Sequence, residues 1–149
     1  MPDTTRSDLA SGTSELDDAT YSGLAGFRFA IRQFMSFSDT ISSVAGITSQ
    51  QYQVMLAIRA SSRRVSSVKH IAEQMLLRPN AAVQIVDRME RARLVTRRRS
   101  PTDGRVVLIS LTSRGTKLLK QLAASHLAEL RRHHALLEAS LALLREINS

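Results

Sequence analysis

Apolar and small residues recur every three or four positions over residues 20–46, which predicts one long amphipathic helix. The main stripe contains Leu24, Phe27, Ile31, Phe34, Ser38, Ile41 and Ala45. Phe29, Phe37 and Val44 lie off this stripe, so the helix has a second apolar face that needs a second packing partner. Gly46 ends the pattern, since glycine takes the left-handed conformation after a helix at little cost. We expect one partner within the chain and another in a second subunit.

Two shorter helical patterns follow. Residues 48–51, Thr-Ser-Gln-Gln, match a capping box, which predicts a helix that begins there and extends to about residue 60. The polar residues 61–64 are expected to form a loop. The next helix is predicted over residues 67–76, where Ser66 or Ser67 supplies the capping hydroxyl.

A fourth helix is predicted over residues 79–92, because Pro79 suits the first helical position after the turn at residues 76–78. Its inward stripe is Ala82, Ile85, Val86 and Met89, and its other side presents Asn80, Ala81, Gln84, Arg88 and Arg91. Small and polar residues at the start, with arginines further along, suit a helix that lies in the major groove of DNA. An ordinary amphipathic surface helix has a polar face too, and this alternative remains open.

Two strand-like runs, residues 94–99 and 106–111, flank a segment with the turn formers Pro and Asp-Gly, which predicts a β-hairpin. Five arginines lie on or beside this hairpin: Arg93, Arg97, Arg98, Arg99 and Arg105. An arginine at a hairpin tip can enter the minor groove of DNA while its neighbours meet phosphates. We expect Asp103 to hold the side chain of Arg105 by a charge-assisted hydrogen bond.

The segment 113–149 is rich in leucine, and Thr112 is expected to cap its first helix. Two leucine patterns suggest two helices, with a break at residues 131–134. Leucines in excess of what the local core needs are typical of a dimer interface. The predicted dimerisation residues are Leu24, Leu136, Leu137, Leu141, Leu144 and Ile147.

Charge divides the chain unevenly. Residues 1–19 hold five acids and one arginine, which gives a local charge of −4. Since the net charge of the whole chain is +8, residues 20–149 carry a charge of +12. We expect residues 1–19 to be a disordered acidic tail, because they offer few large apolar side chains. Between Arg78 and Arg105 there are eight arginines and three acids, a local basic patch that favours a polyanionic partner. The alternative is a solvated arginine-rich face.

Several classes of function are disfavoured. The chain has no cysteine, which excludes disulfides, thiol redox sensing and cysteine-ligated zinc. It has no glycine-rich phosphate loop and no paired-carboxylate spacing, so we expect neither an enzyme nor a cofactor. His126 with His133 or His134 lacks a third convincing ligand, so no metal site is predicted. We also expect no membrane span and no secretory signal, which makes the cytoplasm the default location.

The first helix offers a candidate ligand site. All four phenylalanines of the chain lie there, and an aromatic cluster can line a small-molecule pocket. Arg28 and Arg32 are one helical turn apart on one face, where they could grip a carboxylate. The candidate set is Phe27, Arg28, Ile31 and Arg32. Simple core packing for the aromatic residues and solvation for the arginines are the alternatives.

The order of elements resembles the MarR family of bacterial transcriptional regulators over about residues 20–149. The residues that carry the resemblance are Thr48–Tyr52, Ile71–Met75, Val86–Glu90 with Leu94-Val95, Asp103-Gly-Arg105, and Val107–Thr112 with Gly115. The resemblance implies a mainly α fold with a small β-hairpin wing (α+β), a winged helix-turn-helix between N- and C-terminal dimerisation helices. The corresponding domain boundaries are residues 20–47, 48–112 and 113–149.

The resemblance also implies a homodimer in which each subunit binds half of a near-palindromic operator in double-stranded DNA. The recognition helices would then meet major grooves about 34 Å apart. Many members are repressors that a small phenolic or other aromatic acid releases from DNA. By this resemblance, helix 79–92 is the recognition helix, Arg105 is the arginine at the wing tip and Asp103 orients it. The predicted DNA contacts are Arg78, Pro79, Asn80, Ala81, Gln84, Arg88, Arg97, Arg98, Arg99, Asp103 and Arg105.

One position departs from the family pattern. Arg93 stands where members usually have glycine, between the recognition helix and the first wing strand. A left-handed conformation at this arginine would cost about 1–2 kcal/mol. Either the wing is loosened, or the arginine adds a phosphate contact. Two other functions stay open: a non-specific nucleic-acid-binding architectural protein, and a dimeric interaction module that does not bind DNA.

Overall fold

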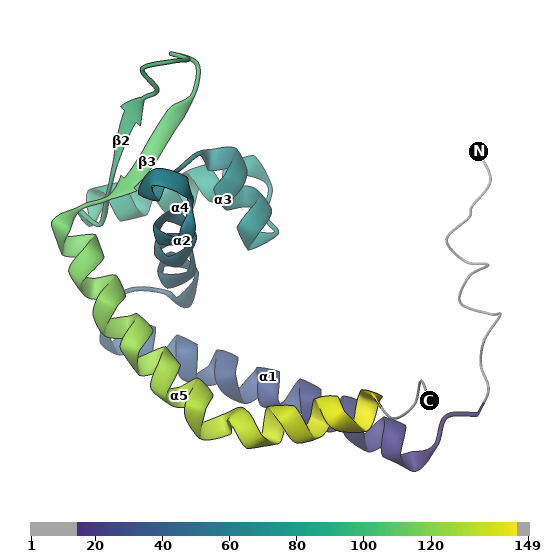
Figure 1. Ribbon diagram of the computed structural model, residues 1–149. Coiled ribbons are helices and arrows are strands. Elements are labelled where there is room, and N and C mark those ends of the chain that lie inside the picture. The colour runs from purple at the N-terminus through teal and green to yellow at the C-terminus, as the bar shows by residue number, and fades with distance from the viewer. Residues whose placement is uncertain (1–14, 146–149) are drawn as a thin grey trace, which may run out of the picture. The chain divides into compact units, whose positions relative to one another are not determined.

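The structure is a computed structural model that describes residues 15–145 (Figure 1). Within that range it contains five α-helices, one short 3₁₀ helix and a three-stranded sheet, which confirms the mainly α fold with a β-hairpin. The elements are α1 (Asp18–Val44), α2 (Ser49–Ala60), η1 (Ser62–Arg64), β1 (Val65–Ser66), α3 (Val68–Met75), α4 (Pro79–Arg91), β2 (Val95–Arg99), β3 (Val107–Leu111) and α5 (Ser113–Arg145). Most of the predicted acidic tail, and the predicted dimerisation residue Ile147, lie outside the described residues.

The chain forms two compact units. The first comprises residues up to 34 together with residues from 130 onward, and the second comprises residues 35–129. The long helices α1 and α5 therefore contribute to both units. Among the described residues, no helix has the length and apolar character that crossing a membrane requires.

The second unit is built around a closed apolar core. Its buried members are Tyr52, Val54, Met55, Ile58, Ile71, Ala72, Ala82, Ile85, Val86, Met89, Leu94, Val95, Ile109, Leu119 and Leu122. They come from α2, α3, α4, the sheet and the start of α5. All four residues of the inward stripe predicted for α4 are buried. The opposite face of α4 is therefore left toward solvent, as its periodicity predicted.

The helix ends follow the local signals in the sequence. Gly46 has a φ of 81° after α1, the left-handed conformation expected of it. The capping box of α2 is formed, because the backbone N–H of Gln51 donates to Thr48 Oγ1 (3.1 Å) and the N–H of Thr48 donates to Gln51 Oε1 (3.0 Å). Of the two candidate caps for α3, Ser67 is the one used, since its Oγ accepts from the N–H of His70 (3.2 Å).

The sheet has one strand more than predicted. β2 and β3 form the expected antiparallel hairpin, with Arg97 opposite Ile109 and Arg99 opposite Val107. β1 pairs antiparallel with the other edge of β3, so the strand order is β1-β3-β2. Two residues are too few to give an alternating pattern, which explains why the sequence did not reveal β1.

The predicted break at residues 131–134 is wrong, because α5 continues as one helix from Ser113 to Arg145. This segment holds only arginine and histidine, so neither proline nor glycine interrupts the i to i−4 hydrogen bonds. Thr112 does cap the helix, since its Oγ1 accepts from the N–H of Gly115 (2.9 Å). In the first unit α5 packs against α1, where Gly23 faces Leu143 and Leu144.

Candidate nucleic-acid interface

The helices α3 and α4, with the turn between them, form a helix-turn-helix. Leu76 takes the left-handed conformation (φ 53°), and the N–H of Leu77 donates to the carbonyl of Ala72 (2.9 Å), which closes the end of α3. Arg78 is extended and Pro79 occupies the first turn of α4, as predicted. The predicted contact residues Arg78, Pro79, Asn80, Gln84 and Arg88 are exposed, and Ala81 is partly exposed. These side chains thus share one solvent-facing surface at the turn and along α4.

The hairpin tip, residues 100–105, is held by its own backbone. The N–H of Ser100 donates to the carbonyl of Val106 (2.8 Å), and the N–H of Val106 donates to that of Asp103 (3.0 Å). Asp103 Oδ1 accepts from the backbone N–H of Arg105 (3.1 Å). The carboxylate therefore shapes the turn, rather than holding the guanidinium of Arg105 as the sequence led us to expect. Arg105 itself is exposed at the tip.

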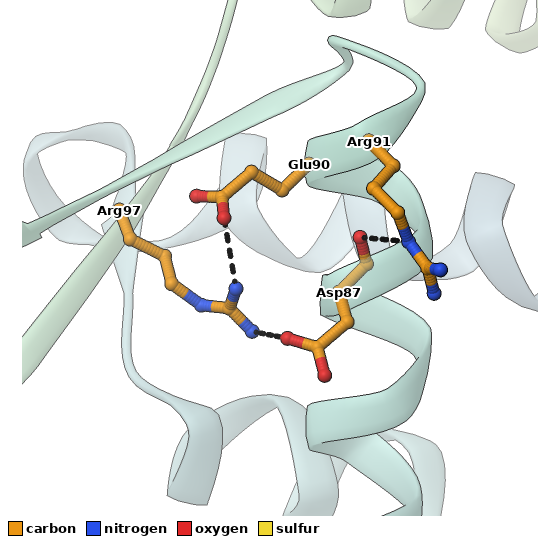
Figure 2. Close-up of polar contacts among 4 residues, drawn as sticks. All are labelled: Asp87, Glu90, Arg91 and Arg97. Atoms are coloured by element: carbon orange, nitrogen blue, oxygen red, sulfur yellow. Dashed lines mark hydrogen bonds and ion pairs between the residues drawn. The ribbon is translucent and has the colours of Figure 1, made fainter.

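Arg97 connects the hairpin to α4 (Figure 2). Its guanidinium forms ion pairs with Asp87 (2.5 Å) and Glu90 (3.1 Å), two acids one helical turn apart on α4. The Arg97 side chain is 23% exposed, whereas those of Asp87 and Glu90 are 46% and 44% exposed. Its donors thus point to α4, and we separate Arg97 from the exposed arginines with which the sequence analysis grouped it. Periodicity did not reveal this role, because a strand residue's partner on a helix depends on tertiary packing.

The other hairpin arginines are placed differently. Arg98 and Arg99 are exposed, and Arg99 Nη1 donates to the carbonyl of Gly104 (3.0 Å). Two of the three acids in residues 78–105 are paired with the least exposed arginine. The remaining arginines of that segment are all exposed: Arg78, Arg88, Arg91, Arg93, Arg98, Arg99 and Arg105. The pairing concentrates positive charge on the surface, which is the electrostatic requirement for binding phosphates.

Arg93 has a φ of 60°, so it takes the left-handed conformation for which glycine is usual. Two hydrogen bonds close the end of α4: Arg93 N–H to the carbonyl of Glu90 (3.0 Å), and Leu94 N–H to that of Met89 (2.9 Å). Thr112 then donates from Oγ1 to the carbonyl of Arg93 (2.6 Å). The link from α4 to β2 is thus tied to the start of α5. Of the two alternatives left open for Arg93, a loosened wing or an added phosphate contact, neither is tested by these hydrogen bonds.

Gly115 makes this connection possible. A Cβ atom at position 115 would lie 2.1 Å from the carbonyl oxygen of Leu94, a distance that no real contact shows. The N–H of Thr112 donates to that same carbonyl (3.0 Å). Since the obstacle is backbone, it cannot move aside as a flexible side chain would. Glycine at this position allows the first turn of α5 to approach the end of α4.

Comparison with known proteins agrees with this geometry. The family pattern described as MarR family matches residues 45–106, which include α2, the helix-turn-helix, β2 and the hairpin tip, but not β3. Over this segment the chain resembles the MarR family. It is 33% identical over 63 residues to the HTH-type transcriptional regulator MhqR of Bacillus subtilis (strain 168), which covers 42% of this chain and 43% of that one. It is 35% identical over 99 residues to the organic hydroperoxide resistance transcriptional regulator of the same strain, covering 66% of this chain and 63% of that one.

The chain thus spans less than two thirds of the length of either relative in these alignments. Among solved structures, Sco3205, a MarR family transcriptional regulator from Streptomyces coelicolor in complex with DNA, matches with a TM-score of 0.68 and 20% identity. That match covers 82% of this chain and 77% of Sco3205. At this identity the likeness establishes the MarR fold.

One of the predicted ligand residues lines a cavity of the first unit. The first unit contains a cavity of about 120 Å³ lined by Ala30, Ile31, Phe34, Leu130, His133 and Leu137. Of the predicted residues only Ile31 lines it. Phe27 is partly buried elsewhere, and Arg28 and Arg32 are exposed and absent from its walls. This cavity therefore does not coincide with the predicted ligand set, which stays a prediction.

The predicted dimerisation leucines mostly stay exposed in the single chain. Leu24 is 44% exposed, and Leu136 and Leu141 are more than one third exposed. Leu137 and Leu144 are partly buried within the first unit, where Leu137 lines the cavity. Phe29, Leu130 and Leu143 add to the exposed apolar surface of this unit. Exposed apolar area of this extent is typical of an interaction surface.

The histidines occupy separate environments. His126 is buried in the second unit, where it stacks on Tyr52 (4.0 Å between ring centroids) and its Nε2 lies 2.9 Å from Ser38 Oγ. Burial also raises the pKa of the Tyr52 hydroxyl. His133 lines the cavity of the first unit, and His134 pairs with Glu138 (3.3 Å). Among the described residues no group of three possible ligands is placed to hold a metal ion.

Proposed function

We propose that the chain is a homodimeric, sequence-specific DNA-binding transcriptional regulator. The observation that carries the proposal is the combination of an exposed polar face on α4 with an arginine-rich hairpin that Arg97 ties to the same helix. A recognition helix and a wing must keep a constant separation if both are to contact one duplex. The ion pairs to Asp87 and Glu90 supply such a link.

In this proposal α4 enters the major groove. Asn80 and Gln84 are exposed there, and their amides can pair bidentately with adenine, while Arg88 can meet guanine or phosphate. Arg105 at the hairpin tip reaches the minor groove, and Arg98 and Arg99 contact phosphates. The Sco3205 complex with DNA supports this docking through a shared fold.

In this proposal the first unit forms the dimer interface. Its exposed leucines and Phe29 would be covered by the same surface of a second copy, since homodimers usually have twofold symmetry. Two copies would then present two α4 helices to the two halves of a near-palindromic operator.

We further propose repression that a small aromatic ligand relieves. The apolar cavity of about 120 Å³ supports a ligand of roughly one ring, because an apolar cavity of about 150 Å³ holds benzene. His133 supplies a polar group in its wall. A phenol is therefore a better candidate than an acid gripped by Arg28 and Arg32.

The test is binding to the DNA directly upstream of the protein's own coding region, compared with a shuffled duplex of equal length at about 0.15 M salt. We expect at least about a hundredfold preference, with two subunits per site. Gln84→Ala should change the preferred bases more than the total affinity. Equal affinity for both duplexes, with a steep salt dependence, would favour the non-specific alternative, and absence of binding would favour an interaction module.

A further inference from the structure

A second group of arginines lies in a hollow of the second unit, away from the hairpin tip. Arg59 near the end of α2, with Arg63 and Arg64 of η1, forms one part of its wall. The start of β1, the end of β3 and the first turn of α5 form the rest. Its volume is about 310 Å³.

The charge in this hollow is not compensated. No acid is among the residues that line it. In the range 15–145, none of its three guanidinium groups forms an ion pair, in contrast to Arg97 with its two carboxylates. Ser110 and Thr116 add hydroxyl groups to the wall, while Val65 and Leu111 give it an apolar part.

The backbone holds two of these arginines in an unusual conformation. Arg63 and Arg64 both have a φ of 59°. This value lies in the left-handed region, which residues other than glycine and asparagine rarely adopt. Consecutive strained residues persist where the surrounding structure holds them, and such positions cluster at ligand sites. Here η1 ends in β1, whose pairing with Ser110 and Ile109 holds the segment against β3.

The hollow is remote from the proposed DNA contacts of the hairpin. β3 runs from Val107, beside the tip, to Leu111, which lines the hollow. At about 3.4 Å per residue, Arg105 and Ser110 are separated by about 17 Å along the strand. The hollow is therefore at the base of the hairpin.

We propose that Arg59, Arg63 and Arg64 bind a small organic anion that carries a phosphate or carboxylate group on a small apolar body. The planar guanidinium binds either group through two parallel hydrogen bonds. Val65 and Leu111 contact the apolar part, and the volume is at the lower end of the range of small-molecule sites. This site is independent of the proposed regulatory function.

The test is calorimetric titration of the full chain at about 0.15 M salt with phenyl phosphate, benzoate, inorganic phosphate and phenol. We expect one site per chain for phenyl phosphate or benzoate, weaker binding of inorganic phosphate and none of phenol. The stronger of the first two probes identifies the anionic group. Arg63→Gly and Arg64→Gly each remove a guanidinium while glycine accepts the left-handed backbone. Each substitution should lower the affinity for the anion by about tenfold or more without lowering Tm.

Lys120→Gln is the matched control, because it removes one positive charge from an exposed position of α5 outside the hollow. It should leave the affinity for the anion within about twofold. Equal affinity of the wild type and the Arg63→Gly/Arg64→Gly variant would overturn the proposal. So would a lack of saturable anion binding up to about 10 mM. Loss of DNA affinity in that variant without anion binding would assign these arginines to DNA instead, and neither result would alter the roles proposed for α4 and Arg105.

Discussion

The two units of the chain use their apolar residues in opposite ways. In the second unit Val54, Met55 and Ile58 are fully buried within a core that several elements share. In the first unit Leu24, Phe29 and Leu136 remain exposed, although they lie on helices with clear apolar stripes. The second unit therefore encloses an apolar core, although Val44 and Leu76 stay exposed, whereas the first unit leaves most of its large apolar side chains exposed in the single chain. Because α1 and α5 contribute to both units, the same helix can bury its apolar side chains in one unit and leave them exposed in the other.

The largest effect should come from the closed core. Ile58→Ala removes a fully buried side chain, and we expect the free energy of unfolding to fall by about 2–5 kcal/mol. Urea denaturation at a fixed protein concentration measures this change. Leu56→Ala is the matched control, because Leu56 lies on the same helix with 44% of its surface exposed and should cost much less. Similar losses at both positions would contradict the contrast between core and surface.

The exposed surface of the first unit should matter for assembly rather than for folding of the single chain. Leu136→Asp places a charge on it, and we expect the Kd of the dimer to rise by about a hundredfold, since a buried unpaired charge is costly. Sedimentation velocity over a range of concentrations measures the shift. Arg131→Asp, at an exposed polar position of the same helix, tests whether any new negative charge acts alike. An unchanged dimer would place the subunit contact elsewhere.

The arginines of the hairpin should separate into two roles. Arg105→Ala removes an exposed donor at the tip, and DNA affinity should fall by about 1–3 kcal/mol with a smaller salt slope. Arg97→Gln breaks the ion pairs to Asp87 and Glu90, and it should weaken binding by less than Arg105→Ala. Its salt slope should stay close to that of the wild type, because no phosphate contact is lost. If Arg97→Gln reduced the salt slope of DNA binding as much as Arg105→Ala does, Arg97 would contact DNA directly.

The smallest effect, with the opposite sign, is expected at Arg93. Arg93→Gly replaces a residue at a φ of 60° with one that tolerates this conformation, so the free energy of unfolding should rise by up to about 1 kcal/mol. DNA affinity should fall slightly if the exposed guanidinium meets a phosphate. Thermal unfolding and titration of the same operator duplex measure the two quantities. A drop in Tm would show that the arginine side chain stabilises the connection more than its backbone strains it.

The successes and errors of the sequence analysis follow from the distance between interacting residues. The capping box at Thr48, the left-handed Gly46 and the first-turn Pro79 were all predicted correctly. Each depends on partners within a few residues, so the chain itself places them together. The buried stripe of α4 was also predicted, because helical periodicity and apolar character determine it jointly.

The errors concern residues whose interaction partners are far away in the sequence, or for which a nearby group offers an alternative interaction. β1 pairs with residues more than forty positions away, and the break expected in α5 rested on polar residues that a helix accepts on its exposed side. For Asp103, a backbone N–H two residues ahead was available without ordering a long side chain, so it prevailed over the guanidinium.

By itself, the sequence determined the first four helices, the hairpin and the basic character of residues 78–105, since these depend on local spacing and composition. Only the tertiary structure decided which arginines are paired and which remain exposed. Arg97 and Arg98 are neighbours in sequence, but opposite faces of a strand turn one toward the acids of α4 and the other toward solvent. Charge can be counted in a sequence, but its compensation depends on which surfaces the fold brings together.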